Sequence, residues 1–389
     1  MQNDLLAKPP PATRFEARQP DGGVALLFFI RGGHLMLARQ PFHPAQGGRY
    51  QDLSSGRIGP REACTDFTSA LSVATPGRTQ MLHLAMVVND GRSDCLYLSL
   101  SNPAAAWSAA PAWVACPFDA GLSPARVVIS RVLIGDASDR PFIVADVVIN
   151  PDSAAPRRVR YSIDAWRSFG PRWIEHRLPV DSQANAHATC LGRCRGGWVV
   201  DGLYLAARGE QEAQLLYAPL YNPFNPMQPR WSRRLEIPGK LAAEVIAACR
   251  NADNTSDLYV TAQGGLYYFS ATNQNECAQG LALGNAPGLE DVRTLFAANT
   301  GGRVTLWGLN GAGQAICTSA PQAFVADPAA WSAPEVVLSN VAAIAPCPDR
   351  GTADMAFYAR MPGGLVRAAR PADSRLWRCD DVVLPTQDD

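Results

Sequence analysis

Side chains that commonly carry catalysis or bind metal ions are sparse in this chain. Its 389 residues include only five histidines, and His43 is the only one that we place in a loop rather than in or beside a strand. The metalloprotease pattern HExxH, the serine hydrolase pattern GxSxG, the Walker phosphate loop and the dinucleotide pattern GxGxxG are all absent from the sequence. The residues therefore favour a protein without catalytic residues, metal ligands or a cofactor of these types.

The ten cysteines are spaced irregularly, and only Cys190 and Cys194 lie close together. These two do not form a CxxC pair, whereas structural zinc sites usually need closely spaced Cys or His ligands. We therefore expect reduced thiols that serve as small apolar side chains inside strands. Cys190 and Cys194 are the pair best placed to contradict this expectation.

Sugar binding is a third kind of chemistry, and several residues beside predicted hairpin turns suit it. A sugar ring is recognised by a flat aromatic face with hydrogen-bond donors and acceptors next to it. Asn-Gly and Asp-Gly pairs are also ordinary hairpin residues, and an aromatic ring in a strand more often packs in a core. The candidate binding residues are Asn89, Asp90, Trp198, Tyr267, Trp307 and Asn310.

The elements that would position these residues recur at a period of about fifty residues. Each repeat holds four short apolar runs, separated by turns rich in Gly, Asn and Asp. Four short strands at this period are typical of one blade of a β-propeller. The repeats cover residues 12–56, 63–119, 124–181, 184–239, 241–286, 289–340 and 341–385.

We therefore predict an all-β fold, a seven-bladed β-propeller of four-stranded antiparallel blades. One blade cannot cover both of its own faces, so neighbouring blades must bury each other's apolar side chains. An α/β fold would need crossover connections of about a dozen residues or more, and the chain leaves no room for them between the runs. Residues 12–385 are predicted to form this single propeller, with 1–11 and 386–389 as tails outside it.

An aromatic residue opens the fourth run in six of the seven repeats. We expect these rings to fill the gap between the outer strands of adjacent blades, and in particular we expect Trp331 and Trp377 to be largely buried. The alternative is that the same rings stack on a ligand. The six residues are Tyr50, Trp113, Trp173, Trp231, Trp331 and Trp377.

Two runs resemble blades of the β-propeller lectins, in particular the tectonin-like and fucose-lectin-like propellers. They are 264–269 (Gly-Gly-Leu-Tyr-Tyr-Phe) and 363–367 (Gly-Gly-Leu-Val-Arg), the latter followed by Trp377. The resemblance implies sugar binding in grooves between blades. The blades of this chain do not repeat one set of polar residues, so one or two sites are expected rather than one for each blade.

The favoured interpretation is a non-catalytic binding module whose ligand is a carbohydrate. One alternative is a protein–protein interaction scaffold, because propeller rims commonly bind protein partners. A second alternative is an enzyme with its site at the mouth of the propeller channel, although polar residues there can equally hydrogen-bond loop backbone. The channel-mouth candidates are Asp66, Ser130, Arg131, Thr189, Arg250, Asn299 and Asp349.

The composition also limits the classes of partner that we expect for this chain. The 35 basic residues balance the 35 acidic ones, so no global charge attracts the chain to nucleic acid or to an anionic membrane. No apolar run is long enough for a membrane-spanning helix. The N-terminus has Asp4 and three consecutive prolines where a signal peptide has positive charge and an apolar run. We therefore expect a cytoplasmic protein, or one exported without a classical signal peptide.

Overall fold

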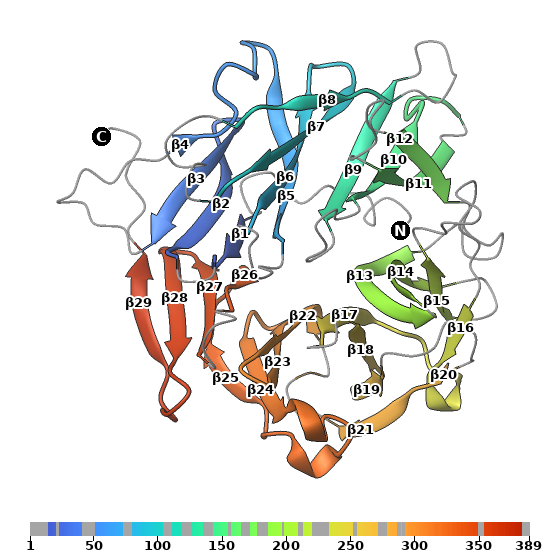
Figure 1. Cartoon of the computed structure of the whole chain (residues 1–389), viewed down its shortest axis with the longest axis vertical. Coiled ribbons are helices and arrows are strands. Elements are labelled where there is room, and N and C mark those ends of the chain that lie inside the picture. Colours follow the sequence, from blue (N-terminus) through green and yellow to red (C-terminus); the bar gives the residue numbers. More distant parts are fainter. Residues whose placement is uncertain are drawn as a thin grey trace. The chain divides into compact units, whose positions relative to one another are not determined.

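The computed structural model describes two compact units, one of Met1–Arg177 with Val383–Asp389 and one of Leu178–Val382. Within the described residues, the regular structure consists of β-strands and three short 3-10 helices. With the exception of β20 (Ala278–Gln279), each sheet takes its strands from consecutive sequence, as Figure 1 shows by the order of its colours. The residues described are 15–20, 23–40, 51–72, 80–103, 111–118, 126–134, 143–154, 157–164, 172–176, 186–196, 198–208, 213–219, 233–251, 255–270, 278–285, 289, 292–348 and 354–382.

The first unit contains three four-stranded sheets, each in simple sequence order. All neighbouring strands in them are antiparallel. The strands are β1 (Phe15–Arg18), β2 (Ala25–Arg31), β3 (His34–Gln40) and β4 (Gln51–Asp52); β5 (Ala63–Leu71), β6 (Leu82–Asn89), β7 (Asp94–Ser101) and β8 (Val114–Cys116); β9 (Val127–Ile134), β10 (Ile143–Ile149), β11 (Arg157–Asp164) and β12 (Arg172–His176).

The second unit contains four sheets of the same kind. Their strands are β13 (Ala186–Gly196), β14 (Trp198–Arg208), β15 (Ala213–Pro219) and β16 (Arg233–Glu236); β17 (Val245–Arg250), β18 (Ser256–Ala262), β19 (Gly265–Phe269) and β21 (Leu281–Asn285); β22 (Val292–Thr300), β23 (Arg303–Asn310), β24 (Ala315–Pro321) and β25 (Glu335–Leu338); β26 (Ala343–Pro346), β27 (Met355–Met361), β28 (Gly364–Arg370) and β29 (Arg378–Val382). The 3-10 helices are η6 (Pro238–Lys240), η7 (Gln322–Phe324) and η8 (Pro328–Ala330).

One strand of the second unit departs from simple order. The two-residue strand β20 (Ala278–Gln279) pairs in parallel with β16 and so becomes a fifth strand of the preceding sheet. The amide of Gly280 donates to the carbonyl of Glu236 at 2.8 Å, which fixes this addition. β20 therefore covers the outer edge of β16, which would otherwise present unpaired backbone groups.

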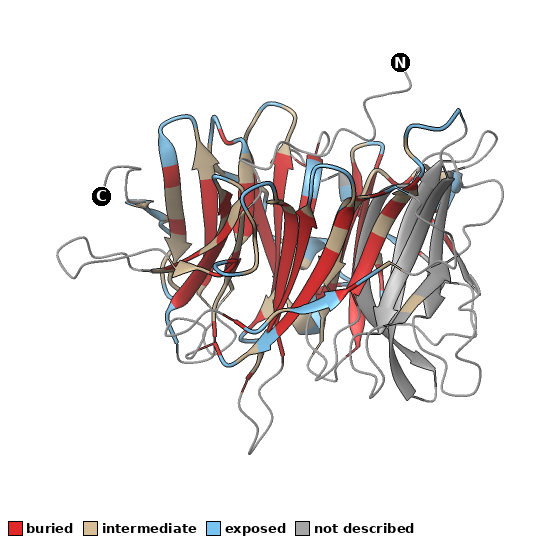
Figure 2. Ribbon diagram, turned by 90° about the horizontal axis from the view of Figure 1, so that it is seen from above, coloured by how far each residue is buried: buried red, intermediate tan, exposed pale blue. Residues whose placement is uncertain are grey.

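The middle strands are buried on both faces, as the red strands of Figure 2 show. In β6, Leu84 and Met86 pack with Phe28 of the first sheet, whereas Val87 packs with Ile129 of the third. Successive side chains of a strand point to opposite faces, so an all-apolar strand needs a partner sheet on each side. This explains why the apolar runs of the sequence do not alternate with polar residues.

Buried carboxylates join neighbouring sheets of the first unit through hydrogen bonds to main-chain amides. Glu16 Oε2 accepts from the amide and the hydroxyl of Ser69, each at 2.7 Å. Asp66 Oδ2 accepts from the amide of Val132 at 2.9 Å, and Asp94 serves the same strand, β9, in the same way. Hydrogen bonds to a charged acceptor are stronger than neutral ones, so these links add orientation to the non-directional apolar packing.

The seven described cysteines are free thiols, as predicted. They are Cys64, Cys95, Cys116, Cys249, Cys317, Cys347 and Cys379. The side chains of Cys190 and Cys194 lie outside the described part, so that pair stays untested. No helix in the described residues is long and apolar enough to cross a membrane.

Candidate functional site

The tryptophans beside the fourth strands can be compared by the acceptor that each indole N–H uses. In the first unit, Trp113 Nε1 donates to the carbonyl of Leu53 at 2.7 Å, and Trp173 Nε1 donates to that of Pro117 at 3.0 Å. Leu53 and Pro117 directly follow the outer strands of the preceding sheets, β4 and β8. Each indole therefore fastens one outer strand to the next, which is the packing role expected from the sequence.

Trp331 differs in its acceptor, which lies in the β24–β25 connection of its own sheet, whereas its ring contacts the preceding sheet. Its Nε1 donates to the carbonyl of Val325 at 3.0 Å. Its ring meets Tyr259 of the preceding sheet edge to face, with 5.7 Å between ring centroids. Trp331 and Trp377 are both half-buried, whereas the sequence analysis expected both to be largely buried.

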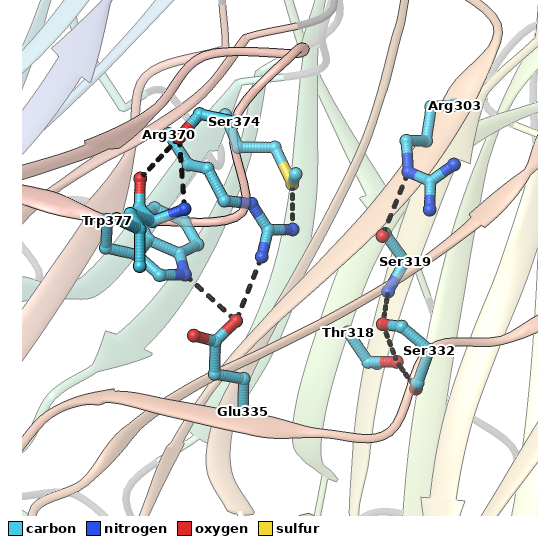
Figure 3. A network of polar contacts seen from close by, with 10 residues as sticks. Arg303, Thr318, Ser319, Ser332, Glu335, Arg370, Ser374 and Trp377 are labelled. Carbon is cyan, nitrogen blue, oxygen red and sulfur yellow. Dashed lines mark hydrogen bonds and ion pairs between the residues drawn. The ribbon is translucent and has the colours of Figure 1, made fainter.

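Trp377 departs from this pattern because its acceptor is a carboxylate. Trp377 Nε1 donates to Glu335 Oε2 at 3.1 Å, and Arg370 Nη1 forms an ion pair with the same oxygen at 2.9 Å. The Arg370 guanidinium carbon lies 5.0 Å from the centroid of the indole. Figure 3 shows the three side chains converging, and we call Glu335, Arg370 and Trp377 the polar trio.

Two neighbouring sheets supply the polar trio. Glu335 opens the outer strand β25 and lies opposite Cys317, whereas Arg370 ends β28 opposite Met355. Arg370 Nη2 also lies 3.4 Å from the sulfur of Met355, so the guanidinium is held from two sides. Trp377 precedes β29, and its ring meets Phe357 edge to face at 5.7 Å.

The turn before Trp377 is fixed by its own hydrogen bonds. Ser374 donates its amide to the carbonyl of Pro371 at 3.0 Å, and its hydroxyl accepts from the amide of Leu376 at 3.0 Å. The amide of Ala372 donates to Asp354 Oδ1 at 2.9 Å. These hydrogen bonds fix the turn that precedes the indole.

The polar trio offers an acceptor, a donor and an aromatic ring within one half-exposed cluster. The side chain of Glu335 is 44% exposed and that of Arg370 is 15% exposed. Among the described residues, both contacts of the carboxylate use Oε2, which leaves Oε1 to accept from a ligand hydroxyl. Arg370 keeps further N–H groups that can donate to a second hydroxyl.

The candidate residues at the β6–β7 turn are used by the turn itself. Asn89 donates from Nδ2 to Asp94 Oδ1 at 2.6 Å and accepts from the amide of Gly91. Asp90 Oδ1 accepts from the amides of Ser93 and Arg92, each at 2.8 Å. These two hydrogen bonds, Ser93 first, hold the pKa of Asp90 below its usual range. The geometry is that of a capped hairpin.

Asn310 is also a turn residue. Its Nδ2 donates to Gln314 Oε1, and its Oδ1 accepts from the amide of Gln314, both at 2.9 Å. The turn ends at Gly313, whose φ of 73° suits glycine. The polar atoms of Asn310 therefore serve the backbone of the β23–β24 hairpin.

The aromatic candidates differ from the expectation of exposed rings. Trp307 is a correction, because only 1% of its surface is exposed and it packs between β22–β25 and β26–β29 with Phe357. Tyr267 is half-buried and packs against the apolar cluster that contains Phe269. The backbone of Trp198 lies in β14, and its side chain is outside the described part. Asn89 and Asp90 share the β6–β7 turn and Trp307 and Asn310 share β23, whereas Tyr267 lies in β19.

The channel-mouth candidates that are described bond to the protein's own structure. Ser130 Oγ donates to the carbonyl of Asp146 at 3.2 Å, and Asn299 Nδ2 donates to Gln322 Oε1 at 2.6 Å. Asp66 is 4% exposed and accepts from a main-chain amide of β9. These contacts fit the structural interpretation of these residues. Asp349 and the side chain of Thr189 lie outside the described part.

A serine, a histidine and an aspartate meet where β3 begins and β4 ends, a group that the sequence analysis missed. His34 Nδ1 lies 3.0 Å from Asp52 Oδ2 and 3.3 Å from Ser54 Oγ. In a catalytic triad the histidine stands between the serine and the acid. Here Ser54 donates directly to Asp52 Oδ1 at 2.7 Å and is fully buried. The hydroxyl also accepts from the amide of Leu35, so the group fixes strand register.

Comparisons with known proteins give a likeness of fold. No protein family and no curated protein matches the sequence. The BP39L lectin from Burkholderia pseudomallei aligns over 95% of this chain and 98% of its own, with a TM-score of 0.53 and 16% identity. A puromycin hydrolase aligns over 98% of this chain at a TM-score of 0.50 and 13% identity. This chain spans only 56% of that hydrolase.

The fold prediction is confirmed at the level of class. Apart from the added parallel strand β20, the described sheets are four-stranded and antiparallel, and the lectin of like fold is a β-propeller protein. The blade count of seven and the single propeller over 12–385 stay predictions.

Proposed function

We propose that this chain is a carbohydrate-binding module and that the polar trio is its sugar site. The observation that carries the proposal is the convergence of an indole N–H and a guanidinium on one oxygen of Glu335. Trp113, Trp173 and Trp331 donate instead to main-chain carbonyls, which is enough for packing. Packing of an outer strand against the next sheet does not need a carboxylate and an arginine such as Glu335 and Arg370.

The chemistry of the polar trio matches neighbouring hydroxyl groups on one sugar ring. Glu335 Oε1 accepts from one hydroxyl, and Arg370 donates to the next. The exposed part of the Trp377 ring gives the apolar C–H face of the sugar a surface to pack on. Hydrogen bonds to charged groups contribute more than neutral ones, so a site of three side chains can hold a small ligand.

Two further observations support the proposal. The polar trio lies between β22–β25 and β26–β29, and the lectin-like blade pattern of the sequence implies sites between blades. A lectin is among the solved proteins that share the fold over nearly the whole chain. A protein–protein scaffold would use a larger and more apolar surface than these three side chains provide.

The matched pair Trp377→Phe and Trp331→Phe tests the proposal. A glycan array with wild-type protein identifies a bound oligosaccharide, and calorimetry then measures its Kd for each variant. Both substitutions keep an aromatic ring and remove one indole hydrogen bond, but only Trp377 contacts Glu335. Trp377→Phe is expected to weaken binding about tenfold, whereas Trp331→Phe leaves Kd unchanged. Equal effects of the two substitutions, or no glycan bound by the wild type, would contradict the proposal.

A further inference from the structure

The interface between β22–β25 and β26–β29, which holds the polar trio, contains a second arginine, Arg303, at the start of β23. Arg303 lies four residues before Trp307 on β23, and the side chain of Trp307 packs toward β26–β29. Side chains two residues apart share a face of a strand, and so do side chains four residues apart. Arg303 therefore faces the same interface as Trp307. Figure 3 draws Arg303 in a second hydrogen-bonded group with Ser319 and Ser332, and no dashed line joins this group to the polar trio.

Arg303 differs from Arg370 in having no carboxylate partner among the described residues. Its Nε donates to the hydroxyl of Ser319 at 3.0 Å. Ser319 is fully buried and is itself held, because its amide donates to Ser332 Oγ at 3.0 Å. Thr318 Oγ1 donates to the carbonyl of Ser332 at 2.6 Å. The guanidinium is therefore positioned through Nε, while Nη1 and Nη2 have no hydrogen-bond partner among the described residues and can donate to a ligand.

Two hydroxyl groups without hydrogen-bond partners lie on the same face. Thr305 is 0% exposed and pairs across the sheet with Ser319, and Thr300 is 1% exposed and pairs with Arg303. Neither Oγ1 has a hydrogen-bond partner. Buried polar atoms without partners are uncommon in native proteins. This end of the interface therefore has several donors, and among the described residues no acidic side chain is hydrogen-bonded to Arg303, Thr300 or Thr305.

Cys317 and Ser319 on β24 mark the positions beside which the two arginines are held. Glu335 pairs with Cys317, and Ser319 lies two residues further along β24, or about 7 Å at the rise of a strand. Burial raises the pKa of the Cys317 thiol to about 12, whereas Arg370 and Arg303 both act to lower it. The thiol is neutral at physiological pH, so it does not cancel either positive charge.

We propose that Arg303 is the anion subsite of the sugar site, and that the ligand is an acidic sugar. Its carboxylate binds Nη1 and Nη2 of Arg303 while its ring hydroxyls bind Glu335 and Arg370. The guanidinium fork matches a carboxylate in two parallel hydrogen bonds. The residues of β24 that lie beside the two anchors, Cys317 and Ser319, are about 7 Å apart, a length that one sugar ring with its carboxyl substituent spans. This inference rests on the proposed function of the polar trio.

The test compares acidic oligosaccharides with neutral counterparts. An array of uronic-acid, sialylated, sulfated and neutral oligosaccharides is probed with the wild type, and the best acidic ligand is then measured by calorimetry before and after reduction of its carboxyl groups to alcohols. The acidic form is expected to bind the wild type at least about tenfold more tightly than the reduced form. That preference should shrink as salt is added.

Arg303→Gln is the deciding variant, with Arg303→Lys and Arg293→Gln beside it. Arg303→Gln should abolish the preference for the acidic form and leave Kd for the reduced form unchanged. Arg303→Lys should retain part of the preference, because it keeps the charge without the fork. Arg293, an exposed arginine of β22 that bonds the carbonyl of Gly311, serves as the control and should change neither value.

The possible failures are distinguishable. Equal binding of acidic and reduced forms by the wild type, or an unchanged preference in Arg303→Gln, overturns the anion subsite while the polar trio stands. A sulfated ligand that binds most tightly and loses its preference in Arg303→Gln supports the subsite with a sulfate in place of the carboxylate. A wild type that binds no oligosaccharide overturns both proposals.

Discussion

Replacement of Trp113 tests whether the fourth-strand tryptophans fasten one sheet to the next. Its Nε1 donates to the carbonyl of Leu53 at 2.7 Å, and Leu53 is fully buried. Trp113→Phe keeps most of the apolar ring but leaves that carbonyl without its donor, which costs about 1–3 kcal/mol for a buried group. Trp113→Ala also removes the ring. Because the ring is half-buried, we expect a loss near the lower end of about 3–5 kcal/mol.

The assay is thermal denaturation followed by calorimetry, with urea denaturation as a second measure of stability. In a unit of this size, 1 kcal/mol corresponds to a shift in Tm of about 2–4 °C. Trp113→Phe should therefore lower Tm by at least about 2 °C, and Trp113→Ala should lower it further. Phe324→Leu is the control, because Phe324 is 58% exposed and should leave Tm nearly unchanged. The reasoning fails if Trp113→Phe melts within about a degree of the wild type.

Three further outcomes follow from local geometry. In the native protein at pH 8, the thiol reagent DTNB should react first with the exposed Cys379 and leave Cys317 unmodified, since burial raises the Cys317 pKa to about 12; rapid loss of all thiols would contradict this. In an NMR pH titration, Asp90 should stay charged below its usual pKa, because two amides bind the charged form, and the turn should lose this stabilisation only as pH falls through that lowered pKa; a normal titration would refute it. Gly313→Ala should destabilise more than Gly302→Ala, because both have positive φ but only a Cβ at 313 meets a carbonyl oxygen, at 3.2 Å; equal Tm values would refute the contact.

The fold could be predicted because its signal is local and repeated. Strands such as β6 read as uninterrupted apolar runs since they are covered on both faces, and turns such as Asn89–Gly91 mark where they end. The parallel strand β20 could not be predicted, because two residues that cross to a preceding sheet leave no periodic pattern. Its only traces in sequence are a long polar loop and the missing aromatic residue of that repeat.

The candidate site was harder to predict, because proximity between sheets is not written in local patterns. Glu335 is 35 residues from Arg370 and 42 from Trp377, and neither spacing has a motif. Trp377 was identified from its repeat position, but not its carboxylate partner. Trp307 was interpreted as exposed because it stands near a turn, yet it lies on the middle strand β23, where neighbours cover both faces. Asn and Asp beside glycine had two possible roles, and hydrogen-bond geometry assigns them to turns.

The most direct test of the central claim is the indole N–H spectrum of the protein during sugar titration. The chain has nine tryptophans, so up to nine indole signals are expected, and Trp377→Phe assigns the one that matters. If the polar trio binds sugar, addition of the bound oligosaccharide shifts the Trp377 signal, while the signals of Trp113 and Trp331 stay in place. Glu335→Gln should abolish that shift. A ligand that binds without moving the Trp377 signal would contradict the account and place the site elsewhere.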